Sequence, residues 1–127
     1  MINEWYEGTE LENKIPNFKS TDVKFITDFH YFIGYNSYYD QVSFLEISFL
    51  LEVDSRKFIL KMKFNDVTTL DLLGFGNSYN QITGFRINNL KDKGFELPKK
   101  YLVEDYENNI IKFFCASFEV LSVVETS

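Results

Sequence analysis

Apolar and polar side chains alternate along the chain between residues 41 and 73. One set of alternate positions is apolar: Ile47, Phe49, Leu51, Phe58, Leu60, Met62 and Phe64. The positions between them are charged or polar: Glu46, Ser48, Glu52, Lys57, Lys61 and Lys63. A period of two is that of a β-strand, whose successive side chains point to opposite faces. The pattern therefore predicts antiparallel sheet with one buried and one exposed face.

Similar patterns, bounded by turn residues, predict strands along most of the chain. Their expected ranges are residues 22–33, 41–53, 56–64, 68–75, 81–89, 101–106, 110–116 and 118–124. The gaps are too short for parallel crossovers, which need about a dozen residues or more. A short helix is expected within residues 3–15, with Gly8 and Thr9 interrupting it. We therefore expect a mainly β fold, an antiparallel sheet or sandwich of about eight strands, in a single β-rich domain spanning residues 1–127.

Turn chemistry predicts how neighbouring strands pair. A two-residue loop at residues 54–55 pairs Leu51 with Phe58, Phe49 with Leu60, Ile47 with Met62, Glu52 with Lys57 and Glu46 with Lys63. A three-residue loop at residues 65–67 pairs Met62 with Leu70, Leu60 with Leu72 and Lys61 with Asp71. A tight turn at residues 108–109 pairs Val103 with Phe114 and Asp105 with Lys112. The expected core includes Phe49, Leu51, Phe58, Leu60, Phe113 and Val120.

Net charge, cysteine count and the lengths of the apolar segments indicate which partners and which cellular compartment to expect. The formal net charge of −6 repels phosphate backbones, which argues against nucleic acid as a direct partner. Cys115 is the single cysteine, so no intramolecular disulfide can form, and we expect the thiol to be a small buried apolar group. No segment approaches the roughly 18 apolar residues of a membrane span, and no basic stretch followed by an apolar run opens the chain. We expect a cytoplasmic protein.

The residues supply no constellation typical of catalysis, of a metal or of a cofactor. One histidine and one cysteine cannot make a zinc or iron site. His30 follows Asp28 by two residues, as a general base beside its orienting carboxylate would, but an isolated histidine is more often a hydrogen-bonded surface residue. Residues 74–78 contain Gly-x-Gly after a strand, yet Tyr79 stands where a phosphate-binding loop needs its third glycine. We expect no enzyme and no cofactor.

The most unusual segment of the chain is rich in tyrosine. Tyr31, Tyr35, Tyr38 and Tyr39 are interrupted by Gly34, Asn36, Ser37 and Asp40. Tyrosine with serine, glycine and asparagine combines rigid contact area with adaptable hydrogen bonds, a mixture favoured at protein-binding surfaces. An aromatic loop packed onto the core is an equally good interpretation. The candidate partner-binding residues are Asp28, Tyr31, Tyr35, Tyr38, Tyr39 and Asp40.

Residues 58–85, reading FILKMKFNDVTTLDLLGFGNSYNQITGF, have a strand, a turn, Val-x-x-Leu-x-Leu-x-Gly-Phe and a further strand. This stretch resembles the immunity protein 50 family of bacterial polymorphic toxin systems. Residues 113–115 and the closing FEVLSVV resemble the aromatic-Cys strand and the C-terminal strand of that family. Family members commonly carry a Phe-His-Asp element in the N-terminal half, whereas here Phe29 and His30 are followed by Tyr31. No binding residues are carried over from the family.

The resemblance implies a small cytoplasmic protein that neutralises a cognate toxin by binding it, with no chemistry of its own. The rival hypothesis is a small ligand-binding or enzymatic β-domain that uses Asp28, His30 and nearby tyrosines around a pocket. A third is a structural subunit of a larger assembly, which would form obligate oligomers. The sequence leaves the oligomeric state and the identity of the toxin open.

Overall fold

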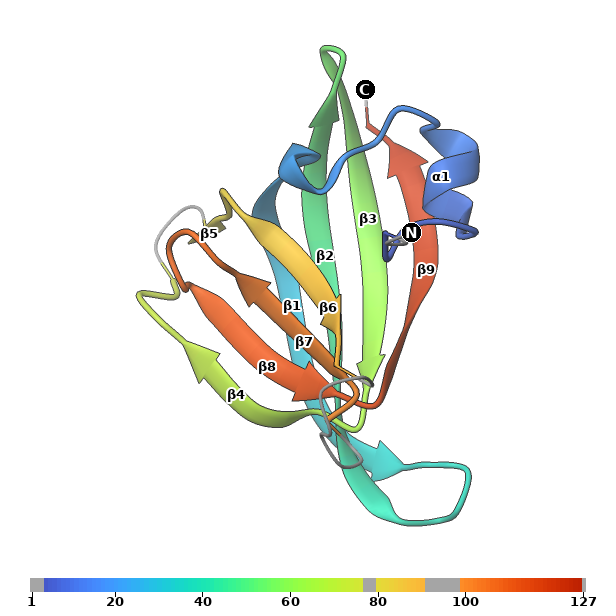
Figure 1. The fold of residues 1–127 in the computed structure, drawn as a ribbon, viewed down its shortest axis with the longest axis vertical. Helices are drawn as coiled ribbons and strands as arrows, with labels where there is room; N and C mark the ends of the chain where they lie inside the picture. Colours follow the sequence, from blue (N-terminus) through green and yellow to red (C-terminus); the bar gives the residue numbers. More distant parts are fainter. Residues whose placement is uncertain (1–3, 77–79, 91–98, 127) are drawn as a thin grey trace.

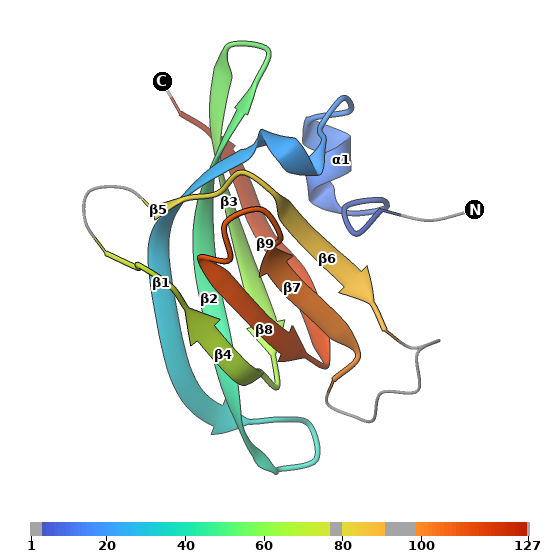
Figure 2. The ribbon, with the colours of Figure 1, turned by 60° about the vertical axis from the view of Figure 1, so that its left-hand side comes forward.

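The computed structural model describes residues 4–76, 80–90 and 99–126. Helix α1 (Glu10–Lys14) and the 3-10 turn η1 (Ser20–Asp22) precede the strands. The strands are β1 (Val23–Tyr35), β2 (Gln41–Val53), β3 (Arg56–Asn65), β4 (Thr68–Leu72), β5 (Asn80–Gln81), β6 (Phe85–Asn89), β7 (Tyr101–Asp105), β8 (Ile111–Cys115) and β9 (Ser117–Glu125). Over these residues, a five-stranded sheet of order β5-β1-β2-β3-β9 faces a four-stranded sheet of order β4-β8-β7-β6 (Figures 1 and 2). The pairings are antiparallel, so the fold is the expected antiparallel β-sandwich.

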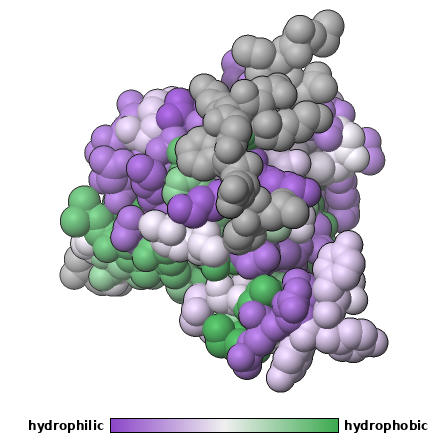
Figure 3. Space-filling model, turned by 60° about the horizontal axis from the view of Figure 1, so that its bottom comes forward, coloured by the Kyte–Doolittle hydropathy of each residue, from purple (hydrophilic) through white to green (hydrophobic). Residues whose placement is uncertain are grey.

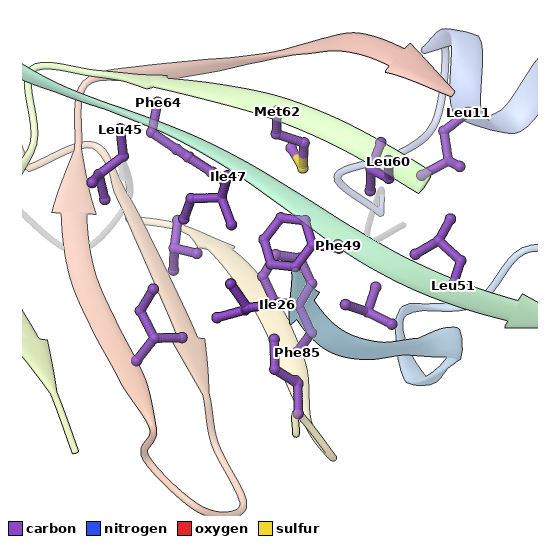
Figure 4. Packing of buried hydrophobic residues seen from close by; sticks show 14 of the residues in the cluster. Leu11, Ile26, Leu45, Ile47, Phe49, Leu51, Leu60, Met62, Phe64 and Phe85 are labelled. Atoms are coloured by element: carbon purple, nitrogen blue, oxygen red, sulfur yellow. The ribbon is translucent and has the colours of Figure 1, made fainter. Parts of the chain in front are cut away.

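The alternation along β2 and β3 fills the space between the sheets (Figure 4). Phe49 of β2 contacts Phe85 of β6, with ring centroids 5.0 Å apart. Phe64 of β3 meets Phe113 of β8 edge to face, also at 5.0 Å. Aromatic pairs of this kind add to the stabilisation that comes from burying their area. The core is therefore continuous from one sheet to the other.

The N-terminal segment closes one end of the sandwich. Helix α1 lies beside β9, and its Leu11 is fully buried (Figure 1). Trp5 packs against Phe85 and donates an indole hydrogen bond to Ser20 Oγ at 2.8 Å. The helix is shorter than the expected range of residues 3–15, because Gly8 has a φ of +76° and the helix begins only at Glu10.

The hairpin formed by β2 and β3 confirms the predicted register. All five predicted pairs are present, among them Phe49 with Leu60 and Glu52 with Lys57. The two loop residues Asp54 and Ser55 have φ values of +51° and +66°. Two positive φ values are the mark of a type I′ turn, whose twist matches that of the flanking strands.

The pairing predicted after residues 65–67 is wrong. β4 does not pair with β3; it belongs to the other sheet, where Asp71 faces Lys112 of β8 rather than Lys61. The chain leaves the first sheet at Val67, which is buried and donates its N–H to Ser43 O at 2.9 Å. The open edge of β3 is taken by β9, with Met62 opposite Val120. After β3 the chain therefore crosses to the second sheet and does not form a local β3–β4 hairpin.

The turn at residues 108–109 exists, but the predicted register is wrong by one residue. Val103 faces Phe113, and Lys112 faces Glu104 rather than Asp105. Asp105 is fully buried, and its carboxylate accepts the N–H of Gly84 at 3.0 Å. The Asn109 N–H donates to Asp105 O at 2.9 Å, which closes a longer loop than the tight turn expected.

The single strand expected over residues 81–89 is two strands in different sheets. β5 pairs with Phe25 and Ile26 of β1, whereas β6 pairs with β7. The Gly-x-Gly segment before β5 has φ values of +61° at Gly74 and +121° at Gly76. Its continuation at Asn77, Ser78 and Tyr79, like Pro98, lies outside the described residues.

The expected core residues are inside. Phe49, Leu51, Phe58, Leu60 and Phe113 are buried, and Val120 is partly buried against them. Cys115 is fully buried, and this burial raises the pKa of its thiol to about 12. The thiol is therefore the apolar filler that the sequence predicted.

We expect Phe113→Ala to lower the free energy of unfolding by about 3–5 kcal/mol, because it leaves a cavity against Phe64 at the contact between the sheets. Val124→Ala is the matched control, since Val124 is exposed on β9. Denaturant unfolding measures both variants. Equal, small losses would show that the two faces have been interchanged.

Candidate functional site

The β1–β2 hairpin extends beyond the rest of the sandwich. In Figure 1 its loop lies at the bottom of the molecule, past the ends of the second sheet. Figure 3 brings this end forward, with the hairpin protruding at the lower right. We call residues 31–44 the projecting hairpin. Tyr35, Tyr38 and Tyr39 are 67%, 82% and 86% exposed there.

One face of the projecting hairpin continues the core face of the sheet. Tyr31 is paired with Leu45, and residues directly opposite in an antiparallel pair share a face. Leu45 is fully buried, and alternation carries this face on to Ile33 and Tyr35. Tyr31 and Ile33 are nevertheless 49% and 52% exposed. Tyr31 and Ile33 therefore point to the same side as the core residues, but no second sheet covers them.

The opposite face of the hairpin is braced by aromatic rings. Phe32 stacks on Phe44 with centroids 5.3 Å apart, and Lys63 Nζ lies 5.0 Å from the Phe44 ring. Gly34 makes room for this ring, because a Cβ at that position would lie 2.8 Å from a Phe44 ring carbon. Phe44 is buried as a result. The brace stiffens the hairpin without using the exposed tyrosines.

The loop at the end of the hairpin is organised by Asn36. Its side-chain Oδ1 accepts the N–H groups of Tyr38 and Asp40 at 2.9 and 3.0 Å. Its backbone O accepts the Tyr39 N–H at 3.0 Å, and its own N–H donates to Asp40 O at 3.0 Å. These four bonds define a three-residue hairpin loop with a left-handed residue in its last position. That residue is Tyr39, with φ +64°.

A bulky residue with positive φ is uncommon, and the position normally favours glycine. Tyr39 makes no ring contact that would offset this strain within the described part of the chain, and it is the most exposed of the large apolar side chains. Strained residues held by surrounding hydrogen bonds cluster at functional sites. The strain at Tyr39 therefore marks the loop as a candidate binding surface.

A cavity of about 340 Å³ lies at the root of the loop. It is bounded by the loop itself, by the β3–β4 turn and by the β8–β9 corner, with Asn36, Tyr38, Phe44, Asp66, Lys100 and Ser117 among its lining residues. Burial raises the pKa of the Asp66 carboxyl, and the negative charge of Asp40 raises it further. Ser43 anchors the root by donating its hydroxyl to Val67 O at 2.5 Å. The cavity could admit one side chain of a partner at the base of the tyrosine loop.

The structure gathers most of the predicted site residues but separates one of them. Tyr31, Tyr35, Tyr38, Tyr39 and Asp40 all lie on the projecting hairpin. Asp28 is exposed too, but it pairs with Ser48 and so lies on the face opposite Tyr31. A register shift between Ile26 and Asp28 precedes it.

His30 lies on the same face of the sheet as Asp28. We call this the outer face, because it points away from the second sheet, and the face of Tyr31 the inner face. His30 lies opposite Glu46 and has its ring centroid 4.8 Å from that of Phe32. The tyrosines of the inner face are thus on the other side of the sheet from both residues. Among the residues that the structure describes, no three His, Cys, Asp or Glu side chains converge as metal ligands.

Sequence reasoning missed three contributors to this surface. Ile33 was not singled out, although it alternates with Tyr31 and Tyr35 on one face. Asn36 was treated as a loop residue, whereas its side chain organises the loop. Phe44 supplies the brace. Only the first carried a sequence signal, because the other two roles depend on loop geometry and on cross-strand register.

We expect Tyr39→Gly to raise the free energy of unfolding by about 1 kcal/mol, because glycine adopts a φ of +64° without strain. Tyr38→Gly is the control: Tyr38 is equally exposed and is not among the residues with positive φ, so glycine there should leave stability unchanged or lower it. Chemical denaturation compares the two. Equal losses of stability in both variants would contradict the assigned strain.

No helix within the described ranges has the length and apolar character needed to cross a membrane. Comparisons of the chain with protein-family models, with curated proteins and with solved structures find no match.

Proposed function

We propose that this protein is an immunity-type binding protein that neutralises a cognate bacterial toxin by direct contact, and that the projecting hairpin is the contact surface. The observation that carries the proposal is the exposure of Tyr35, Tyr38 and Tyr39 on an element that the core does not need. Tyrosine is enriched at protein interfaces and at their energetic hot spots. Single exposed apolar residues are ordinary, but a cluster of them on one projecting element calls for a partner.

Rigidity of the hairpin supports the same proposal. Four hydrogen bonds centred on Asn36 fix the loop, and the Phe32–Phe44 stack fixes the two strands. A surface that is ordered before binding loses less conformational entropy when the partner docks. The strain at Tyr39 is then a stability cost that keeps one ring in position for contact.

Charge indicates the kind of toxin. The chain carries a formal net charge of −6, and residues 28–40 contain Asp28 and Asp40 but no lysine or arginine. Such a surface complements a basic protein, and a nuclease domain is basic because it binds phosphate backbones. The resemblance of residues 58–85 and 113–124 to the immunity protein 50 family supports a cytoplasmic protein of this kind.

The rival function, a small ligand-binding or enzymatic domain, needs Asp28 and His30 to act together with tyrosines around one pocket. The two residues lie on the outer face, whereas Tyr31 and Tyr35 lie on the inner face. The lining of the cavity at the loop root includes Tyr38 but neither Asp28 nor His30. The arrangement thus favours contact with a protein. A structural subunit would instead be found as an obligate oligomer in solution.

Gene neighbourhood and co-expression provide the first experiment. We expect the gene beside this one to encode a large protein with a C-terminal toxin domain, and this chain to protect cells that express that domain. The two proteins should co-purify as a stable complex. Absence of both protection and complex formation would refute the proposed function.

We expect alanine at Tyr35, Tyr38 or Tyr39 to weaken toxin binding by more than about 1 kcal/mol for at least one position, without unfolding the domain. His30→Ala is the matched control and should leave both binding and protection intact, because His30 lies on the face of β1 opposite Tyr35 and outside the loop that carries Tyr38 and Tyr39. Calorimetry with the inactivated toxin domain measures affinity. Normal binding by all three tyrosine variants would place the interface elsewhere.

We expect the association rate to fall as salt concentration rises, while the dissociation rate changes less, since the charges of the two proteins act mainly by steering. Asp40→Asn should reduce the salt dependence, because it removes an exposed charge from the loop. Stopped-flow kinetics over a series of salt concentrations tests this. An association rate independent of salt would contradict the charge argument.

A further inference from the structure

The backbone of β1 has an open side along the projecting hairpin. The Asn36 N–H donates to Asp40 O, so residues 36 and 40 form a hydrogen-bonded pair. The β1–β2 register is uniform from Asp28 to Tyr35, so this pair determines which other pairs of the ladder are hydrogen-bonded. In an antiparallel ladder, hydrogen-bonded and non-hydrogen-bonded pairs alternate. The backbone groups of Gly34 and Phe32 therefore hydrogen-bond to β2. Those of the alternating residues Tyr31, Ile33 and Tyr35 do not.

Tyr31, Ile33 and Tyr35 consequently direct their backbone N–H and C=O groups away from β2. A separate contact confirms this assignment. Ser43 lies opposite Ile33, and its C=O accepts the N–H of Val67 on the side away from β1. The same three residues that expose their side chains on the inner face thus expose three backbone donors and three acceptors at the edge.

Nothing that the structure describes covers this part of the edge. Within the described ranges, β5 pairs with β1 only at Phe25 and Ile26, near the other end of the strand. Exposed edges are normally protected by lysine, by proline or by a bulge. Residues 28–35 contain neither lysine nor proline, and the register shifts of β1 lie before Asp28. The edge is long, regular and unprotected.

We propose that the toxin is recognised by strand addition: an extended segment of the toxin domain pairs with the β1 edge at Tyr31, Ile33 and Tyr35 and becomes a further strand of the five-stranded sheet. The inference rests on the proposed function and specifies its binding mode. Backbone bonds to these residues provide affinity, and every second side chain of the added strand lies beside the exposed inner-face side chains. The tyrosine loop then contacts the toxin next to that strand.

The charge of the edge identifies the occupant. A segment with apolar side chains facing Tyr31 and Ile33, flanked by lysine or arginine, complements the acidic residues Asp28 and Asp40 at the two ends of the edge. A second copy of this chain at the edge would bring like charges together, because each molecule carries a formal net charge of −6. The edge therefore suits a basic partner rather than self-association.

Amide exchange measured by NMR tests the proposal on the unmodified chain. In the free protein, the amides of Tyr31, Ile33 and Tyr35 should exchange rapidly, whereas those of Phe32 and Gly34 should be protected by β2. Addition of the inactivated C-terminal domain of the toxin encoded beside this gene should protect the three outward amides, with little change at Phe32 and Gly34. Rapid exchange at the outward amides in a saturated complex would overturn strand addition.

A proline variant gives an independent measurement. Ile33→Pro removes the outward N–H and places the ring at the edge, a position where a strand tolerates proline. Ile33→Ala is the control, because it loses the side chain but keeps the N–H. We expect the proline variant to bind roughly tenfold more weakly than the alanine variant, with both domains folded by circular dichroism.

The possible outcomes separate the two proposals. Equal binding by the proline and alanine variants, together with weakened binding by the tyrosine variants, would overturn strand addition and leave the proposed function standing. Failure of the unmodified chain to bind the toxin domain would overturn both. Concentration-dependent dimers of the free chain with protected outward amides would show that a second copy occupies the edge, and would also overturn this inference.

Discussion

A difference in length between the two sheets exposes the apolar side chains of the projecting hairpin. β1 and β2 have 13 residues each, whereas β4, β6, β7 and β8 have 5 each. At about 3.3 Å per residue, the long strands extend roughly 40 Å and the short ones roughly 17 Å. The alternation that buries Leu45 and Ile47 therefore continues past the covering sheet, where it exposes Tyr31, Ile33 and Tyr35.

The projecting hairpin needs its own sources of order, because the core does not reach it. An isolated two-stranded ribbon is only marginally stable in water. The Phe32–Phe44 stack, the space left by Gly34 and the Asn36 hydrogen bonds supply that order from the outer face and from the loop. They leave the inner face, the edge of β1 and the loop rings available for a partner. The contacts that stabilise the two strands thus lie mainly on the outer face, and the groups available to a partner lie on the inner face, at the edge and in the loop.

The parts of the fold that the sequence predicted are those decided locally. The hairpin at Asp54 and Ser55 was predicted pair by pair, because a two-residue turn and the alternation on both strands leave one register. The pairing of β4 was wrong, because β9, more than fifty residues further along the chain, competes for the edge of β3. The register near Asn109 was wrong because it depends on burying the Asp105 carboxylate, which no alternation reveals.

The candidate site divides in the same way. Composition alone indicated that Tyr35, Tyr38 and Tyr39 were candidates for an exposed surface, and they are exposed. Composition did not show that Asp28 lies on the face opposite Tyr31, although the alternation along β1 does, because the register is uniform from Asp28 to Tyr35. The open edge of β1 was hidden, since it depends on where β5 ends.

The most direct test of the central claim is the affinity of a shortened hairpin for the toxin domain. Replacing residues 35–41 by Asn-Gly joins Gly34 to Val42, a pair in the existing register, through a two-residue turn that suits a hairpin. The account predicts a folded domain, with the cooperative unfolding of the parent, that binds the toxin much more weakly and protects cells less than the parent does. Unchanged affinity after loss of the loop and its tyrosines would contradict it.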